Sequence, residues 1–256
     1  MAYLEIYGES TANNIRLNPP AGLATTVELI GNRSRAEHVV AFGSSDVHIL
    51  VTGNDCRVSG SDVESAVVAG ISVTGLRAII TSVESRFGTT GCGLRIDGGA
   101  DCLVSNFTSQ SDENGVIIDG AIRWKLQNVH VQSSDTEGVI IDSSSEGTGD
   151  FTVYNAGRHG VRITDSSRNR LSGIIRDAGR DTTNTYDGVF VEGNSDRNRT
   201  SFFVTYGGSG NQARYGMNLS AGTVDGHIEA SWLDAGATAD FNDAGTGTVL
   251  TDDHIT

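Results

Sequence analysis

The chain has 256 residues, of which 32 are acidic and 18 are Lys or Arg, and its formal net charge is −14. For so acidic a chain we expect no basic patch large enough to neutralise a run of phosphates, and therefore no nucleic acid partner. Glycine occurs 33 times and proline twice. Because no long segment has helical periodicity and no apolar run could cross a membrane, we expect an all-β chain with many tight turns and no membrane insertion.

The basic residues are almost all arginine. Lys125 is the only lysine, which leaves 17 arginines among the 18 bases. An excess of carboxylates keeps a protein soluble in concentrated salt, where self-repulsion is screened. The composition is typical of proteins from halophilic microbes or their viruses, and the alternative is drift toward arginine in a GC-rich genome.

The first 45 residues show no clear repeat. Short strands are expected within 14–22, 25–30 and 39–42, with Pro19 and Pro20 in a turn. We interpret 1–45 as a segment that caps the domain that follows, because a repeat domain must cover its first unit. The alternative is attachment to other proteins of a larger particle. The sequence starts Met-Ala-Tyr-Leu-Glu-Ile-Tyr and lacks the charged and apolar regions of a signal peptide.

A glycine-led motif recurs along the rest of the chain. It reads Gly-Leu-Arg-Ile-Asp at 93–97, Gly-Val-Ile-Ile-Asp at both 115–119 and 138–142, and Gly-Val-Arg-Ile-Thr at 160–164. Weaker copies start at Gly70, Gly188 and Gly216, and a degenerate copy spans 239–243. A period of 22–28 residues with short strands predicts a single-stranded right-handed parallel β-helix of about eight coils over 46–244, followed by a strand and tail at 245–256.

Alternation along these strands predicts the core. The inward positions form two aliphatic ladders, at Leu94, Val116, Val139, Val161, Val189 and Met217, and at Ile96, Ile118, Ile141, Ile163, Val191 and Leu219. A second strand follows each glycine, with apolar pairs 11 and 14 residues later at Val104 and Phe107, Leu126 and Val129, and Leu171 and Ile174. Cys56, Cys92 and Cys102 are expected to be buried free thiols, because their spacing separates them by coils or faces.

The repeat Gly-(Val/Leu)-x-(Ile/Val)-(Asp/Glu/Thr) between about 70 and 243 resembles the pectate-lyase-like β-helix superfamily. That resemblance implies the fold, and it admits pectate lyases, polygalacturonases, alginate epimerases and viral tailspikes or fibres. The epimerase Asp-Pro-His-Glu motif is absent. The nearest match to polygalacturonase motifs is Arg158-His-Gly-Val-Arg-Ile-Thr164, where arginine and threonine replace the expected glycine and lysine.

Two outward columns could make contacts. The first is acidic, with Asp97, Asp119 and Asp142 stacked on neighbouring coils, and is either a stripe for Ca²⁺ or other salt ions or ordinary turn chemistry. The second is apolar at Ile117, Ile140 and Phe190. Stacked exposed apolar residues predict a homotrimer interface, with cover by a loop of the same chain as the alternative.

The two longest coils are the best place for a ligand site. They carry extra residues within 177–187 and 206–215, and loops on a rigid scaffold commonly hold function. The predicted ligand-binding residues are Arg158, Tyr186, Tyr206, Arg214 and Tyr215, a mixture suited to sugar stacking and hydroxyl recognition. If the chain is a glycosidase, Glu137 and Asp187 form the carboxylate pair, with His159 beside them.

These features favour a structural protein of a virus particle. The expected role is a spike, fibre or turret-like decoration, from a virus of a halophile, that binds cell-surface glycan or glycoprotein. The expected location is therefore virion or extracellular. The alternatives are a polysaccharide lyase or glycoside hydrolase on a β-helix, and a purely structural spacer. No cofactor is expected apart from the salt ions of the acidic column.

Overall fold

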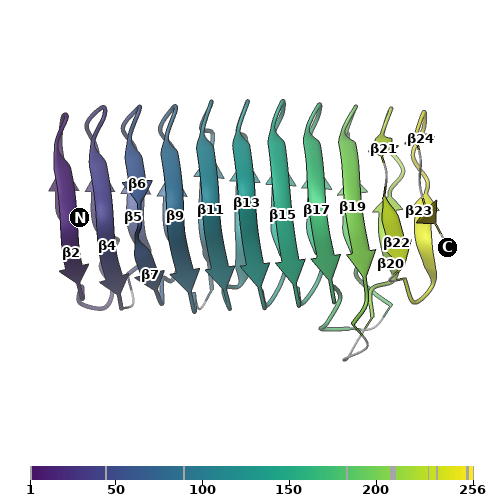
Figure 1. The fold of residues 1–256 in the computed structure, drawn as a ribbon, viewed down its shortest axis with the longest axis horizontal. Coiled ribbons are helices and arrows are strands. Elements are labelled where there is room, and N and C mark those ends of the chain that lie inside the picture. Colours follow the sequence, from purple (N-terminus) through teal and green to yellow (C-terminus); the bar gives the residue numbers. More distant parts are fainter. Residues whose placement is uncertain are drawn as a thin grey trace.

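The computed structural model describes residues 2–43, 45–88, 90–182, 184–207, 212–229, 231–234, 236–251 and 254–255. Over these residues the chain winds as a parallel β-solenoid, with the N-terminus at one end and the C-terminus at the other (Figure 1). No helix in these ranges is long and apolar enough to span a membrane. The all-β parallel β-helix predicted from the repeat is confirmed.

One wall of the solenoid is an 11-stranded sheet, which we call sheet A. Its strands, in spatial order, are β1 (Ala2–Ile6), β3 (Thr25–Leu29), β5 (Val47–Val51), β8 (Ala69–Val73), β10 (Cys92–Asp97), β12 (Asn114–Asp119), β14 (Val139–Asp142), β16 (Val161–Thr164), β18 (Val189–Glu192), β20 (Tyr215–Leu219) and β23 (Ala239–Asp243).

The opposite wall is a 14-stranded sheet, sheet B, which faces the viewer in Figure 1. Its main path is β2 (Thr11–Leu17), β4 (Arg35–Phe42), β6 (Arg57–Ser59), β9 (Ile79–Arg86), β11 (Leu103–Gln110), β13 (Lys125–Gln132), β15 (Thr148–Tyr154), β17 (Arg170–Arg176), β19 (Arg199–Thr205), β21 (His227–Glu229) and β24 (Val249–Thr251). Beside this path lie β7 (Asp62–Glu64), β22 (Trp232–Asp234) and β25 (His254–Ile255).

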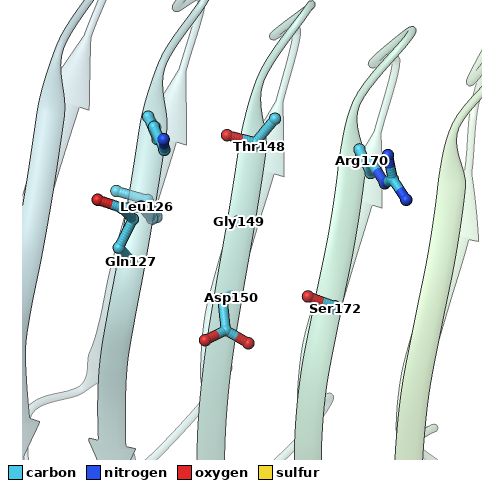
Figure 2. A pocket seen from close by; sticks show the side chains of 8 residues that line it. Leu126, Gln127, Thr148, Gly149, Asp150, Arg170 and Ser172 are labelled. Atoms are coloured by element: carbon cyan, nitrogen blue, oxygen red, sulfur yellow. The ribbon is translucent and has the colours of Figure 1, made fainter.

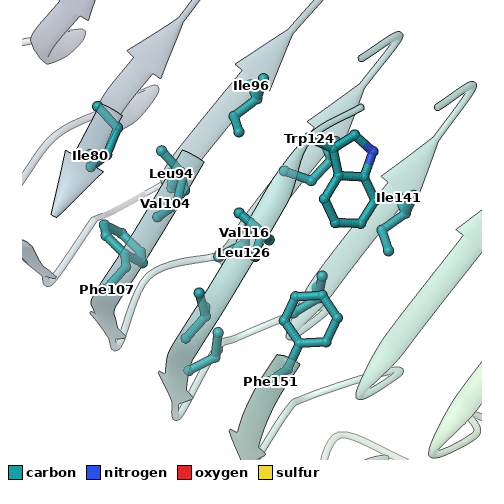
Figure 3. Close-up of a cluster of buried hydrophobic side chains, with 14 of the residues drawn as sticks. Ile80, Leu94, Ile96, Val104, Phe107, Val116, Trp124, Leu126, Ile141 and Phe151 are labelled. Carbon is teal, nitrogen blue, oxygen red and sulfur yellow. The ribbon is translucent and has the colours of Figure 1, made fainter. Parts of the chain in front are cut away.

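The two aliphatic ladders predicted for sheet A form one wall of the core. All twelve side chains are buried, and each pairs in register with its equivalent on the next coil, as Leu94 does with Val116. From sheet B the core receives Val104, Phe107, Leu126 and Phe151 (Figure 3). Trp124 packs among them, and a side chain at Gly147 would collide with its ring.

The solenoid is longer than the eight coils expected, because sheet A contains eleven successive strands in the described residues. The additional coils include β1 to β4, so the boundary predicted after residue 45 falls inside sheet A, where β3 pairs with β5. The glycine is absent here: its column holds Thr26 on β3 and His48 on β5, the first strand of the predicted β-helix. The Thr26 and His48 side chains bond each other at 3.1 Å and share Ser45. Two roles for residues 1–45 stay predictions: capping of the solenoid, and attachment to other proteins of a larger particle.

Ile174 lies 14 residues after its glycine, as Phe107 and Val129 do, but it does not share their inward position. Strand β13 carries a bulge in which Gln127 and Asn128 lie opposite the single residue Asp150 of β15. Since β15 and the strands after it are one residue shorter than β13, the inward position moves from 14 to 13 residues after the glycine. Gly173 therefore faces Phe151, and Ile174 turns outward with 42% of its surface exposed.

A turn column of alternating charge was not predicted. Asp55, Arg77, Asp101 and Arg123 occupy equivalent left-handed turn positions, with φ between 53° and 58°. The Arg77 guanidinium donates to both oxygens of Asp55 at 2.7 and 2.9 Å, and Arg123 does the same to Asp101. Each pair joins neighbouring coils across the solenoid surface.

The three cysteines are buried and free, as predicted. Burial raises the pKa of each thiol, and for Cys92 it reaches about 12. They are therefore small apolar fillers of the solenoid wall rather than reactive groups.

Candidate functional site

The predicted site residues come together where the two long coils begin. Glu137, His159, Asp187 and Tyr215 each precede a repeat glycine, so the register of β14, β16, β18 and β20 places them in one column on successive coils. The Asp187 amide donates to His159 Nδ1 at 3.0 Å, which joins two neighbouring coils directly. The loops that follow β17 and β19 project from the solenoid beside this column (Figure 1).

Asp187 is the centre of the cluster. Its side chain is 0% exposed, and Arg214 donates to both carboxylate oxygens at 3.0 and 2.8 Å. Asn218 Nδ2 donates a third bond at 2.9 Å. A buried carboxylate with three charge-assisted or neutral donors is satisfied. Asp187 therefore organises the side chains around it and has no open oxygen to present to a substrate.

His159 is a neutral spacer in this cluster. Its ring stacks on Phe190 with centroids 4.8 Å apart and forms a T-shaped pair with the Tyr186 ring, with centroids 5.4 Å apart. Burial lowers its pKa below the usual value, and the carboxylates of Asp187 and Glu137 offset only part of that effect. Since Nδ1 accepts the Asp187 amide, the neutral ring carries its proton on Nε2.

Two cation–aromatic pairs form the outer part of the site. The Arg158 guanidinium lies 5.7 Å from the Tyr186 ring centre, and that of Arg214 lies 5.0 Å from the ring centre of Tyr215. Arg158 is exposed, whereas both tyrosines are half-buried. The arrangement offers two guanidinium groups and two phenol groups, and the buried Asp187 holds one of the guanidinium groups, that of Arg214, in place.

Not every predicted residue joins this cluster. Tyr206 packs against the hydrophobic core, and residues 208–211 of its loop lie outside the described residues, as does residue 183 of the other loop. Glu137 is buried above His159. The sequence reasoning missed two members: Asn218, and Phe190, which was assigned to an interface. Both follow a repeat glycine by two residues, and that shared offset was the available signal.

The arrangement gives little support to Glu137 and Asp187 as a catalytic pair. Both side chains are buried, and His159 occupies the coil between them. General acid–base catalysis requires a carboxyl group that can reach the bond to be broken. The geometry is that of a buried ion pair with arginine and tyrosine side chains around it.

The two outward columns lie in the predicted register. Asp97, Asp119 and Asp142 are paired along β10, β12 and β14, and Arg95 approaches the first two at 3.6 and 3.2 Å. Within the described part of the chain, no group of three or more His, Cys, Asp or Glu side chains is placed to hold a metal ion. Ile117 and Ile140 are neighbours and half-buried.

No protein-family model matches the sequence, and a search of curated proteins finds no significant match. The Dettilon tailspike protein aligns over 97% of this chain and 58% of its own, with a TM-score of 0.65 and 11% identity. The enzymatically active domain of bacteriophage CBA120 tailspike protein 2 aligns over 97% of this chain and 47% of its own, with a TM-score of 0.62 and 12% identity. An alginate lyase from a Paenibacillus species aligns over 96% of this chain and 98% of its own, with a TM-score of 0.50 and 12% identity.

The chain thus spans about half the length of these two tailspike structures. At such low identity the likeness concerns the fold alone. The chain is a right-handed parallel β-helix of the tailspike and pectate-lyase type.

Proposed function

We propose that this chain is the solenoid of a virion spike, fibre or turret-like decoration, from a virus of a halophile, that attaches to glycan or glycoprotein on the host surface. One observation carries the proposal: two cation–aromatic pairs, Arg158 with Tyr186 and Arg214 with Tyr215, lie at the long coils, and the buried Asp187 fixes Arg214 of the second pair. Groups fixed before a ligand arrives lose little entropy on binding.

Support for a particle component comes from three features. The fold is similar to phage tailspikes, the acidic composition suits high salt, and Ile117 and Ile140 form a half-buried outward pair that a homotrimer could cover. Other virion proteins would bind at the first coils, whose strands start sheets A and B.

The test uses an array of microbial surface polysaccharides and glycoproteins. The wild-type protein should bind a subset of them, and the double variant Tyr186→Ala, Tyr215→Ala should lose that binding. Tyr3→Ala is the matched control, since Tyr3 is an exposed tyrosine on the first coil. If the double variant binds as the wild type does, this surface is not the attachment site. If the wild type binds nothing on the array or on intact halophile cells, the spacer hypothesis replaces attachment.

A polysaccharide-degrading enzyme is the second candidate, because the fold is also similar to that of an alginate lyase, although the carboxylates of Glu137 and Asp187 are buried. Release of reducing or unsaturated sugars by the wild type, abolished in Glu137→Gln, would support it. Failure to release sugar from any polysaccharide that the protein binds would remove this candidate.

A further inference from the structure

A second surface, on sheet B, combines exposed apolar and basic columns toward the C-terminal end. Ile174, Phe203 and Trp232 pair in register on β17, β19 and β22, and they are 42%, 45% and 40% exposed. The Phe203 and Trp232 rings are 6.1 Å apart and inclined by 26°. Three large apolar side chains stacked on an open sheet face form a stripe, unlike the scattered apolar residues of an ordinary surface.

A basic column runs parallel to this stripe. Lys125, Arg170 and Arg199 lie on one line of sheet B, with Thr148 between the first two. The two arginine side chains are 70% and 55% exposed. At about 3.3 Å per residue, four residues along a strand place the basic column roughly 13 Å from the apolar stripe. Ser172 and Ser201 lie midway between them.

The balance of charge here differs from that elsewhere on the protein. The guanidinium groups of Arg77 and Arg123 each have a carboxylate of their own, but Arg170 and Arg199 share Glu229, at 3.8 and 3.5 Å. Lys125 forms no ion pair with any residue that the structure describes. Asp150 is the other nearby carboxylate, so three cations face two anions on a chain whose net charge is −14.

The face of sheet B has a depression next to the β13 bulge. A depression of about 210 Å³ lies at the step from β13 to β15, lined by Lys125, Gln127, Asp150, Arg170 and Ser172 among others. Figure 2 shows the side chains of Gln127, Asp150 and Ser172 on three neighbouring strands of this face. The walls of the depression combine charged, polar and apolar residues, and Ser172 of β17 is the lining residue that lies two positions before Ile174 of the apolar stripe.

We infer that this face is a binding track for an acidic polysaccharide that lies along the solenoid axis. Phe203 and Trp232 would stack on sugar rings, the serines would bond hydroxyl groups, and Lys125, Arg170 and Arg199 would bind carboxylates. Successive coils are about 4.8 Å apart, which is comparable with the length of one sugar residue, so each coil meets one sugar of an extended chain. The track is separate from the long-coil surface and does not depend on the attachment role of that surface.

The experiment is a titration of the full chain with polygalacturonate and, as the neutral polymer, dextran. Polygalacturonate should bind and dextran should bind much more weakly. Trp232→Leu and Phe203→Leu keep an apolar side chain but remove the ring, and each should weaken binding about tenfold. Arg170→Ala with Arg199→Ala should weaken binding by a similar factor and reduce its salt dependence. His130→Ala, in the same column as Phe203, and Arg57→Ala, in the same column as Arg199, are matched controls that should bind as the wild type does.

Three outcomes would overturn the inference. The first is absence of polygalacturonate binding by the wild type, and the second is equal binding of dextran. The third is that Trp232→Leu and Phe203→Leu lower the molecular mass in light scattering and leave polysaccharide binding intact, since the stripe is then an interface between copies of the chain. Tyr186→Ala with Tyr215→Ala should leave polygalacturonate binding unchanged, so failure of the long-coil site and failure of the track can be told apart.

Discussion

Removal of the Arg214 side chain tests whether the buried ion pair holds the long coils together. The variant Arg214→Ala leaves the Asp187 carboxylate buried, with Asn218 Nδ2 as its remaining side-chain donor. Removing one partner of a buried pair typically costs 3–5 kcal/mol. Arg214 itself is 34% exposed, so water can reach the space it leaves, and we expect the lower limit, about 3 kcal/mol.

The matched control is Arg77→Ala. Arg77 makes the same two-pronged contact with Asp55, at 2.7 and 2.9 Å, but both side chains are exposed. An exposed ion pair contributes little to stability, because water and salt ions take the place of each partner. The Tm of Arg77→Ala should therefore be close to that of the wild type. For a chain of this size about 3 kcal/mol corresponds to a fall of roughly 6–12 °C in Tm.

Thermal unfolding followed by circular dichroism measures the difference, and amide hydrogen exchange locates it. Because coils contact only their neighbours, exchange should accelerate in the coils that contain β16, β18 and β20 while β2 and β4 stay protected. Equal Tm values for Arg214→Ala and Arg77→Ala would refute the idea that the buried Asp187 network stabilises the site.

Four further outcomes are expected. Asp112→Asn should be at least as stable as the wild type at neutral pH, since burial raises the pKa of Asp112, and its advantage should shrink as the pH falls and the wild-type carboxyl becomes protonated. His159 should still give the NMR shifts of a neutral imidazole at pH values where a free histidine is already protonated, because burial lowers its pKa. Stability linked to this group should fall as the pH drops below the pKa of the unfolded chain. Ile140→Asp should convert a trimer to monomers in light scattering, and a wild type that is already monomeric in high salt would contradict the trimer. The Tm should rise between 0.1 and 1 M NaCl. Over this range the Debye length falls from about 10 to 3 Å, so salt screens the repulsion within a chain of net charge −14.

The regular part of the fold could be predicted from the sequence because every coil repeats the same pattern of residues. Each coil from Gly93 to Gly160 repeats a glycine turn and two inward aliphatic residues, so any one of them fixes the register of the rest. The coils before residue 46 were not assigned to the β-helix because Thr26 stands where later coils have the glycine, and its side chain bonds His48 of the next coil instead. The outward position of Ile174 has a similar cause: the lost bulge changes the register by one residue, and a one-residue change reverses the face of the strand.

The part of the candidate site that could be predicted from the sequence is the column of residues that precede the repeat glycines. Glu137, His159 and Asp187 were placed together by their shared position before a glycine. The partners of Asp187 were not, since nothing in the sequence states that Arg214 and Asn218 turn toward it from the next coil. Side-chain direction depends on packing that a spacing rule does not describe.

The charge column along the turns separates two explanations of the unusual base composition. A lysine could neutralise Asp55 or Asp101, but only a guanidinium can bond both carboxylate oxygens from the neighbouring coil, as Arg77 and Arg123 do. The geometry of these two pairs therefore gives a structural reason for arginine, rather than lysine, at positions 77 and 123. The 14 excess acidic charges have no such reason, because pairing in this column consumes acids and bases equally. It is the acid excess, not the preference for arginine, that bears on a saline habitat, and the salt dependence of Tm is the measurement that addresses it.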